Sequence, residues 1–316
     1  MTATAQPFPP PLSATEAVEQ ALMGKQRDWR STAFELALLA SLLMALGILI
    51  WLLTDIFLRA VPVFQERDLF GFLTSPGSSN PLNAGIGQAL LGSLLLMIFV
   101  AVLAIPIGIA SAVYLEEYAA DNAFTRIINT TVRNLAGVPA VVYGLLGIAV
   151  FVVLLKDWTG GPSIISGGLT LVIVVLPIVV IASAEALRAV PDPIREAGFG
   201  VGATKWEVIR SHVIPYAIPG ILTGTILTIG RAFGETAPLL LVGAVTGFFS
   251  VAANAGVVER LQGPYTTLPT VIFSWSRQPR SEFRELTAAA IIVLLVLVLI
   301  INGLAIILRN RYARKW

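Results

Sequence analysis

Two charged residues, Arg231 and Glu235, lie four positions apart in the otherwise apolar stretch IGRAFGETAPLLL. A guanidinium presents a planar fork of N–H donors that suits tetrahedral oxyanions, and a carboxylate four residues along a helix can pair with it. An uncompensated arginine at the centre of a membrane helix costs roughly 2.5 to 3.5 kcal/mol on insertion scales. The pair therefore indicates either a neutralised packing contact or a site that meets an anion in transit.

Small and polar residues recur at helical spacing around this pair. The predicted face is formed by Gly220, Gly224, Thr228, Arg231, Glu235 and, continuing it, Pro238. Small residues let a second helix approach closely, whereas buried charges face the bundle interior or a water-filled path. We predict that Arg231, Glu235 and Thr228 line a substrate path near mid-membrane. The two glycines and Pro238 are predicted to serve helix packing and bending.

Composition identifies the chain as an integral membrane protein. Of its 316 residues 56% are hydrophobic and only 13% are charged, whereas an ordinary soluble domain carries about a quarter charged residues. Six apolar windows are long enough to cross the ~30 Å hydrocarbon core. They run approximately over Ala33–Leu58, Ile86–Tyr114, Leu135–Leu155, Gly168–Leu187, Pro219–Val245 and Thr287–Leu308. The predicted fold class is all-α with six transmembrane helices in a lipid bilayer.

Basic residues favour one side of this predicted topology. Of the 21 Lys and Arg residues, 13 fall on one set of alternate loops and 7 on the other, and Arg231 lies within a span. The positive-inside rule then places both termini in the cytoplasm. A net charge of +2, with no basic stripe, gives no indication of nucleic-acid binding. With no cysteine and one histidine, the composition predicts neither a catalytic thiolate nor a metal site.

The topology divides the chain into functional segments. We expect a cytoplasmic tail over residues 1–32, a first span and outer loop over 33–85, a transmembrane domain over 86–308, and a basic tail over 309–316. Ser13 and Glu16 stand at capping-box spacing, so a short helix and a disordered tail are about equally expected there. A short interfacial helix is expected in the aromatic outer loop 246–286.

A polar cytoplasmic hairpin is predicted over residues 188–217. Asp192 and Pro193 form an N-cap and N1 pair that starts one helix, which the following glycines should stop. Thr204 and Glu207 form a capping box that starts a second helix, and Pro215 is predicted to end it. On these residues alone, the element is equally well explained as a helical hairpin lying in the interface.

The hairpin sequence EAGFGVGATKWEVIRSHVIP resembles the EAA loop of ABC importer permeases. Glu196, Ala197, Gly202 and Pro215 fall at the positions of that pattern, while Gly198, His212 and Ile214 depart from it. The resemblance implies a coupling helix that docks into a cleft of a separate ATPase subunit. In that role Glu196 would supply an ionic anchor, and Gly202 would permit a close turn.

Four further segments are similar in order to the phosphate ABC-importer permeases. They are IPIGIASAVYLEEYA, NLAGVPAVVYGLLG, PGILTGTILTIGRAFGETAPLLLVGA and INGLAIILRNRYARKW, and the likeness covers roughly residue 86 to the end. It implies the type I importer permease fold, with phosphate passing Arg231. It also implies three partners: a sister permease subunit, a dimer of ATPase subunits and an extracytoplasmic phosphate-binding protein.

Alternative functions remain open at this point. Gly24-Lys25 is the only Gly-Lys pair and lacks the earlier glycine of a P-loop, so ATP and Mg²⁺ are expected on the partner ATPase. The alternative most similar to a phosphate importer permease is an importer permease for sulfate or molybdate. Alternatives from other functional classes are a secondary transporter and an intramembrane enzyme. Pro139 is predicted to bend the third span and expose polar backbone to the path, although a kink packed against a neighbour is equally expected.

Overall fold

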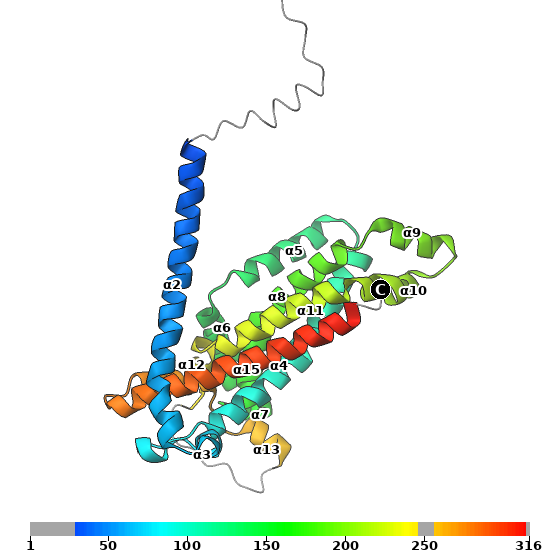
Figure 1. Cartoon of the computed structure of the whole chain (residues 1–316). Helices are drawn as coiled ribbons and strands as arrows, with labels where there is room; N and C mark the ends of the chain where they lie inside the picture. Colours follow the sequence, from blue (N-terminus) through cyan, green and yellow to red (C-terminus); the bar gives the residue numbers. More distant parts are fainter. Residues whose placement is uncertain (1–28, 246–255, 314–316) are drawn as a thin grey trace, which may run out of the picture. The chain divides into compact units, whose positions relative to one another are not determined.

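The computed structural model of the chain describes residues 29–245 and 256–313, so the helix predicted around Ser13 and Glu16 lies outside the described residues. Within these ranges all regular structure is helical (Figure 1). The chain divides into two units, residues 1–55 and 56–316. Five helices are long and apolar enough to cross a membrane, and a bent helix pair supplies a sixth, in agreement with the six predicted spans.

Helix α2, Trp29–Glu66, contributes to both units. In the first unit its apolar side chains are exposed, as expected of a helix whose surroundings are lipid. In the second unit Ala60 and Val63 are buried together with Phe72 of the short helix α3, Leu69–Thr74. The helix therefore extends beyond the predicted end at Leu58.

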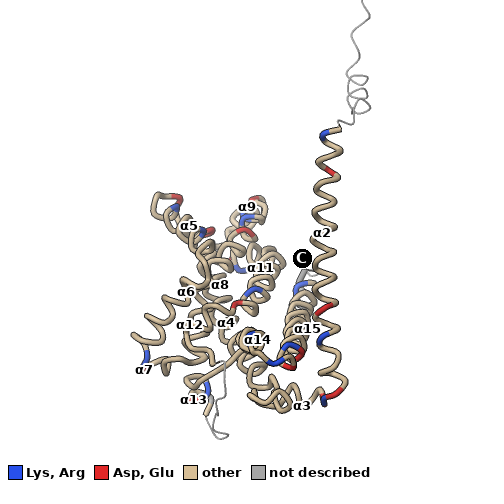
Figure 2. The backbone as a smooth tube through the Cα atoms, turned by 90° about the vertical axis from the view of Figure 1, so that its left-hand side faces the viewer, with Lys and Arg blue, Asp and Glu red and all other residues tan. Residues whose placement is uncertain are grey.

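Helix α8, Ile164–Arg188, is the most buried span of the second unit. Helices α4, Gly87–Val113, and α11, Ile214–Gly234, both pack against it, and α15, Ser281–Ala313, packs against α11. A π-helical turn, η2, Tyr114–Tyr118, continues α4. Figure 2 shows that the charges of this unit gather mostly near helix ends, with long uncharged stretches between them.

The second unit has three apolar clusters along its spans. One is central and joins α4, α8 and α11 with two short helices, α6, Ala140–Gly147, and α12, Ala237–Leu241. A second lies at the outer end, where the last turns of α2 meet the outer loops and the start of α15. The third is at the opposite end, where Ala112 and Val113 of α4 pack with Val190, Val208 and Ile209 of the hairpin. The hairpin is therefore part of the hydrophobic core rather than a loose appendage.

The third span differs most from its prediction. Instead of one helix over Leu135–Leu155, α5, Ala123–Ala136, is followed by α6, Ala140–Gly147, at an angle of 99°. A π-helical segment, η3, Ile148–Leu154, continues α6. The break falls just before α6 because Pro139 has no N–H and disfavours helical geometry at the preceding residue. The predicted kink is thus a break between two helices.

The predicted fifth span, Pro219–Val245, is wrong at its outer end. Helix α11 stops at Gly234, and a separate short helix, α12, Ala237–Leu241, follows after two residues. Hydropathy did not reveal the stop because apolar residues continue on both sides of it. The break leaves Glu235 beyond the helix rather than on its face.

Short helices fill the outer side. They are η1, Pro81–Asn83, α7, Lys156–Thr159, α13, Val257–Gln262, and α14, Leu268–Ser276. The last two fall in the loop where a short interfacial helix was predicted. Leu268, Thr270 and Trp275 of α14 are buried, so this helix packs within the protein instead of lying free in the interface.

Candidate functional site

Arg231 lies in the last turn of α11 and has most of its donors unused. Its Nε lies 3.3 Å from Glu235 Oε1, and the two side chains are 59% and 18% exposed. Among the described residues, Nη1 and Nη2 of Arg231 donate no hydrogen bond. Since a guanidinium carries five N–H donors, four remain available on this exposed side chain. The structure thus brings the predicted pair together without saturating the arginine.

Arg231 is level with the middle of α8. An ideal Cβ on Gly220 would lie 2.8 Å from Ala186 Cβ, and one on Gly224 would lie 2.3 Å from Ala182 Cβ. A step of four residues forward along α11, from Gly220 to Gly224, corresponds to a step of four residues backward along α8, from Ala186 to Ala182. The two helices are therefore antiparallel. The same register, carried seven residues further, puts Arg231 at the level of Val175, near the centre of α8.

Helix α11 ends at Gly234, level with the central part of α8, and the regular helical backbone is interrupted there. Glu235 adopts an extended conformation, with φ −76° and ψ 103°, and its N–H bonds to Ala232 O. Irregular backbone at membrane depth is tolerated only where protein buries it or where it lines a water-filled cavity. Arg231 in the last turn also complements the negative end of the helix dipole. The end of α11 thus combines an exposed arginine with an interrupted helix.

The predicted single face of small and polar residues divides into two. Gly220 and Gly224 meet α8, where they permit close helix packing. Thr228 is buried, and its hydroxyl donates to Gly224 O at 2.8 Å, so the structure does not bring it to the exposed side with Arg231. Sequence spacing alone did not separate these two sides, because a helix has 3.6 residues per turn and repeated steps of three or four residues gradually change the direction in which a side chain points.

Pro238 and Pro139 lie at the two breaks that interrupt the spans. Pro238 is buried in α12, and an ideal Cβ on Gly144 of α6 would lie 2.8 Å from Pro238 Cα. Pro139 occupies the position just before α6. Both residues therefore shape the pair α6 and α12, which pack directly against each other.

The cytoplasmic hairpin contains the two predicted helices with shifted ends. Helix α9, Asp192–Gly200, begins one residue earlier than predicted, because Pro191 rather than Asp192 is its N-cap. The glycines at 198 and 200 lie within α9, and the turn comes at Gly202, whose φ of +81° favours glycine. Glu196 and Ala197 are exposed on α9.

The capping box of the second helix is confirmed. Thr204 N–H donates to Glu207 Oε2 at 2.7 Å, and Glu207 N–H donates to Thr204 Oγ1. The predicted stop at Pro215 is wrong: α10, Lys205–Val208, passes through the π-helical segment η4, Ile209–Val213, directly into α11. Pro215 comes just after η4, where the regular α-helical hydrogen bonding is already interrupted, so its missing N–H is accommodated within the continuous helix.

Exposed apolar side chains surround Glu196 at the hairpin tip. Phe199, Val201 and Trp206 are 48%, 85% and 54% exposed, while the opposite side of the hairpin is buried in the inner apolar cluster. Large exposed apolar side chains next to an exposed carboxylate are typical of a protein interface. His212 is also exposed. The hairpin thus presents exposed apolar side chains and a carboxylate on the side that faces away from the inner apolar cluster.

Two ion pairs at the base of this hairpin, formed by Glu116 and Glu117, were not predicted from the sequence. Arg188 donates to both carboxylate oxygens of Glu116, at 2.7 and 2.5 Å. Arg195 pairs with Glu117 at 2.8 Å. The adjacent glutamates at the end of an apolar span were a usable signal, but their partners lie more than 70 residues away in the sequence.

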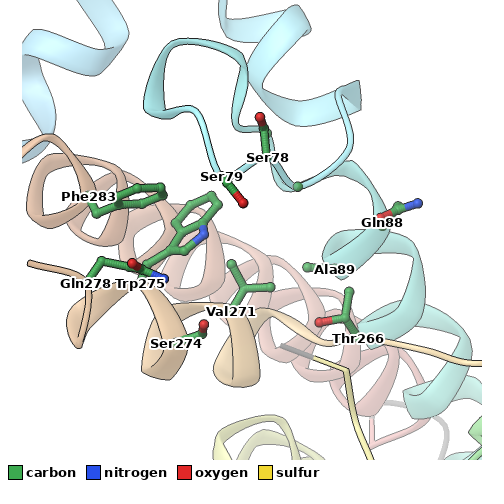
Figure 3. Close-up of a pocket in the computed structure, with 12 residues that line it drawn as sticks. Ser78, Ser79, Gln88, Ala89, Thr266, Val271, Ser274, Trp275, Gln278 and Phe283 are labelled. Carbon is green, nitrogen blue, oxygen red and sulfur yellow. The ribbon is translucent and has the colours of Figure 1, made fainter. Parts of the chain in front are cut away.

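An uncharged pocket of about 190 Å³ lies on the outer side of the second unit. It is bounded by the loop that carries Ser78 and Ser79, by the start of α4, and by α14 and α15 (Figure 3). Trp275 and Phe283 form its aromatic wall, with ring centroids 6.0 Å apart. No charged side chain lines this pocket.

Comparison with known proteins assigns a family to this architecture. Residues 104–314 match the family described as binding-protein-dependent transport system inner membrane component. The phosphate transport system permease protein PstA of Yersinia pestis is 30% identical over 291 residues, which cover 92% of this chain and 94% of that protein. PstA 1 of Mycobacterium tuberculosis is 37% identical over 233 residues, 73% and 71% of the two chains.

Solved structures show the same fold at low sequence identity. One chain of a bacterial alginate ABC transporter, in complex with an alginate-bound periplasmic protein, superposes with a TM-score of 0.62 at 16% identity, covering 89% of this chain and 96% of that chain. A chain of the MetNI methionine ABC transporter, in an inward-facing conformation, gives a TM-score of 0.52 at 17% identity, covering 72% and 94%.

Proposed function

This chain belongs to the family of binding-protein-dependent transport system inner membrane components, and we propose that it is the permease subunit of an ABC importer that carries inorganic phosphate into the cytoplasm. It is a multi-pass protein of the bacterial inner membrane with the type I importer permease fold. The observation that carries the proposal is Arg231, an exposed guanidinium near mid-membrane with four uncommitted donors.

Arg231 provides the chemistry that a phosphate in transit requires. Its planar fork can donate two parallel hydrogen bonds to a tetrahedral oxyanion, and a charge-assisted bond is about twice as strong as a neutral one. Glu235 holds the Nε of Arg231 and leaves the outer edge of the fork open. The carboxylate also repels an approaching anion, which keeps binding weak enough for release. A transient site of this kind suits transport better than tight capture.

The energy source is expected on a separate subunit. The sequence contains no P-loop, so ATP and Mg²⁺ are bound by an ATPase dimer that docks on the hairpin. Glu196 and Ala197 lie exposed on α9, and Gly202 forms the turn that follows. ATP-driven closure of the ATPase pair then shifts the permease between inward-open and outward-open states.

Two further partners complete the proposed importer. A sister permease subunit covers the exposed side of α11 and closes the path around Arg231, because one such chain leaves that side open. An extracytoplasmic phosphate-binding protein delivers substrate at the outer end. The relatives named PstA support phosphate as the cargo.

Uptake of labelled phosphate tests this function. The complex, reconstituted in vesicles with its ATPase and binding protein, should accumulate phosphate only when ATP is present on the ATPase side. Unlabelled arsenate, which has the same shape and charge, should compete more strongly than sulfate. ATP-dependent accumulation of sulfate but not phosphate would refute phosphate as the substrate, and uptake without the ATPase would refute the ABC mechanism.

Charge reversal at Glu196 should separate docking from membrane insertion. The variant Glu196→Lys is expected to retain about a tenth of the co-purifying ATPase, since a tenfold loss needs only about 1.4 kcal/mol. The matched control is Asp121→Lys, which reverses an exposed carboxylate outside the hairpin. Equal recovery of ATPase with both variants, together with normal uptake, would show that Glu196 is not an anchor.

A further inference from the structure

Arg195 of α9 uses every donor it has. Its Nε and Nη2 donate to Glu117 Oε1 at 3.3 and 2.8 Å, and Nη2 also donates to Leu187 O at 3.0 Å. Nη1 donates to Val190 O at 2.7 Å and to Asp192 Oδ1 at 3.2 Å. These five hydrogen bonds match the five N–H groups of a guanidinium. The same type of side chain that is largely free at Arg231 is therefore saturated here.

The bonds of Arg195 join three separate elements. Leu187 belongs to the last turn of α8, Val190 to the link before α9, and Glu117 to the π-helical turn η2 at the end of α4. The Arg195 and Glu117 side chains are only 19% and 8% exposed. Breaking a shielded pair leaves a poorly solvated charge, so such a pair holds its geometry far better than an exposed one.

The two neighbours of Glu117 also hold cations from the hairpin region. Glu116 binds Arg188, at the end of α8, through both carboxylate oxygens. Tyr118 lies under the Lys205 ammonium of α10, which is 5.2 Å from its ring centroid, a cation–π contact. Three consecutive residues of η2 thus contact α8, α9 and α10 in turn.

Helix α4 has no other polar attachment of this kind to the hairpin among the described residues. The hairpin is joined by the chain itself to α8 and α11, whereas η2 lies about 70 residues earlier in the sequence. Apolar packing of Ala112 and Val113 against the hairpin also links them, but dispersion contacts are not directional. Ion pairs with several bonds fix both distance and orientation.

From this geometry we infer that η2 is a transmission element, with Glu117 and Arg195 as its positioning residues. The inference rests on the proposed function, because it takes the hairpin as the surface on which the ATPase acts. When ATPase closure moves α9, Arg195 carries Glu117 and the inner end of α4 with it. Without that pair the hairpin moves but α4 lags, so ATP is hydrolysed without equivalent transport.

The ratio of phosphate moved to ATP hydrolysed tests the inference in the reconstituted complex. Glu117→Gln keeps the shape of the side chain but removes its charge, and we expect this ratio to fall about tenfold while ATP hydrolysis stays within about twofold of wild type. Glu117→Asp keeps the charge on a shorter side chain and should give an intermediate ratio. Asp121→Asn removes the carboxylate of an exposed ion pair with Arg126 and should leave the ratio unchanged.

The outcomes separate this inference from the proposed function. An assembled Glu117→Gln complex with the wild-type ratio would overturn the transmission role. If Glu117→Gln fails to assemble, Glu117→Asp decides: a lowered ratio supports the role, and an unchanged ratio refutes it. A wild-type complex that transports sulfate instead of phosphate would refute the proposed substrate. In that case the ratio of sulfate moved to ATP hydrolysed, compared between wild type and Glu117→Gln, would still test the role of Glu117.

Discussion

Replacing Arg231 by glutamine is expected to lower ATP-driven phosphate uptake at least about a hundredfold while the complex still assembles. Two charge-assisted hydrogen bonds of about 1.5 to 3 kcal/mol each are lost, and every 1.4 kcal/mol is a factor of ten. Assembly persists because Arg231 is exposed and its only described partner is Glu235 at 3.3 Å. Initial uptake rates in reconstituted vesicles, at equal amounts of assembled complex, give the measurement.

Two companion variants make the Arg231 result specific. Arg231→Lys keeps the charge but loses the planar fork, so we expect partial uptake with a weaker apparent affinity for phosphate. Arg126→Gln removes another exposed, ion-paired arginine, at the start of α5, and should leave uptake unchanged. Wild-type uptake by an assembled Arg231→Gln complex would mean that the arginine mainly pairs with Glu235.

Adding a single methyl group at Gly224 should destabilise the second unit. The new Cβ of Gly224→Ala would lie 2.3 Å from Ala182 Cβ, so α8 and α11 must separate, at a cost of about 1 to 3 kcal/mol for overpacking. Gly303→Ala is the matched control, because nothing lies within 4 Å of a Cβ at that helical position. The midpoint of thermal unfolding in detergent should fall for the first variant only.

A compensating change identifies the contact behind this effect. In the double variant Gly224→Ala with Ala182→Gly, the nearest remaining atom is the Cα of residue 182, at 3.6 Å, which is ordinary van der Waals distance. The double variant should therefore be more stable than Gly224→Ala alone, although glycine in a helix costs about 1 kcal/mol. Equal stability of the two would place the strain elsewhere.

Local sequence signals were sufficient for the spans and for much of the hairpin. Apolar windows predicted the six membrane crossings. The capping box was predicted because its two residues, Thr204 and Glu207, are three positions apart in the sequence. The breaks before α6 and after α11 were missed or misplaced, since hydropathy continues across them. Proline has opposite consequences at two positions: Pro139 marks a real break, whereas Pro215 is accommodated within a continuous helix, just after a π-helical segment.

The candidate site was predictable only where its residues are close in sequence. Arg231 and Glu235 are four residues apart, so helical spacing alone predicts their pairing. Which helix each glycine meets, and which side Thr228 takes, depends on where α8 packs, and no local pattern encodes that position. The partners of Glu116 and Glu117 are likewise set by the tertiary fold.

The continuous helix from Lys205 to Gly234 also has a mechanical consequence. At 1.5 Å per residue this helix is about 45 Å long, with the hairpin at one end and Arg231 at the other. The tight contact of Gly224 with Ala182 lies about 28 Å from Lys205 and about 10 Å from Arg231, which makes it a natural fulcrum. A lever of these proportions converts a displacement of about 3 Å at the hairpin into about 1 Å at the guanidinium, enough to break a hydrogen bond to a bound anion.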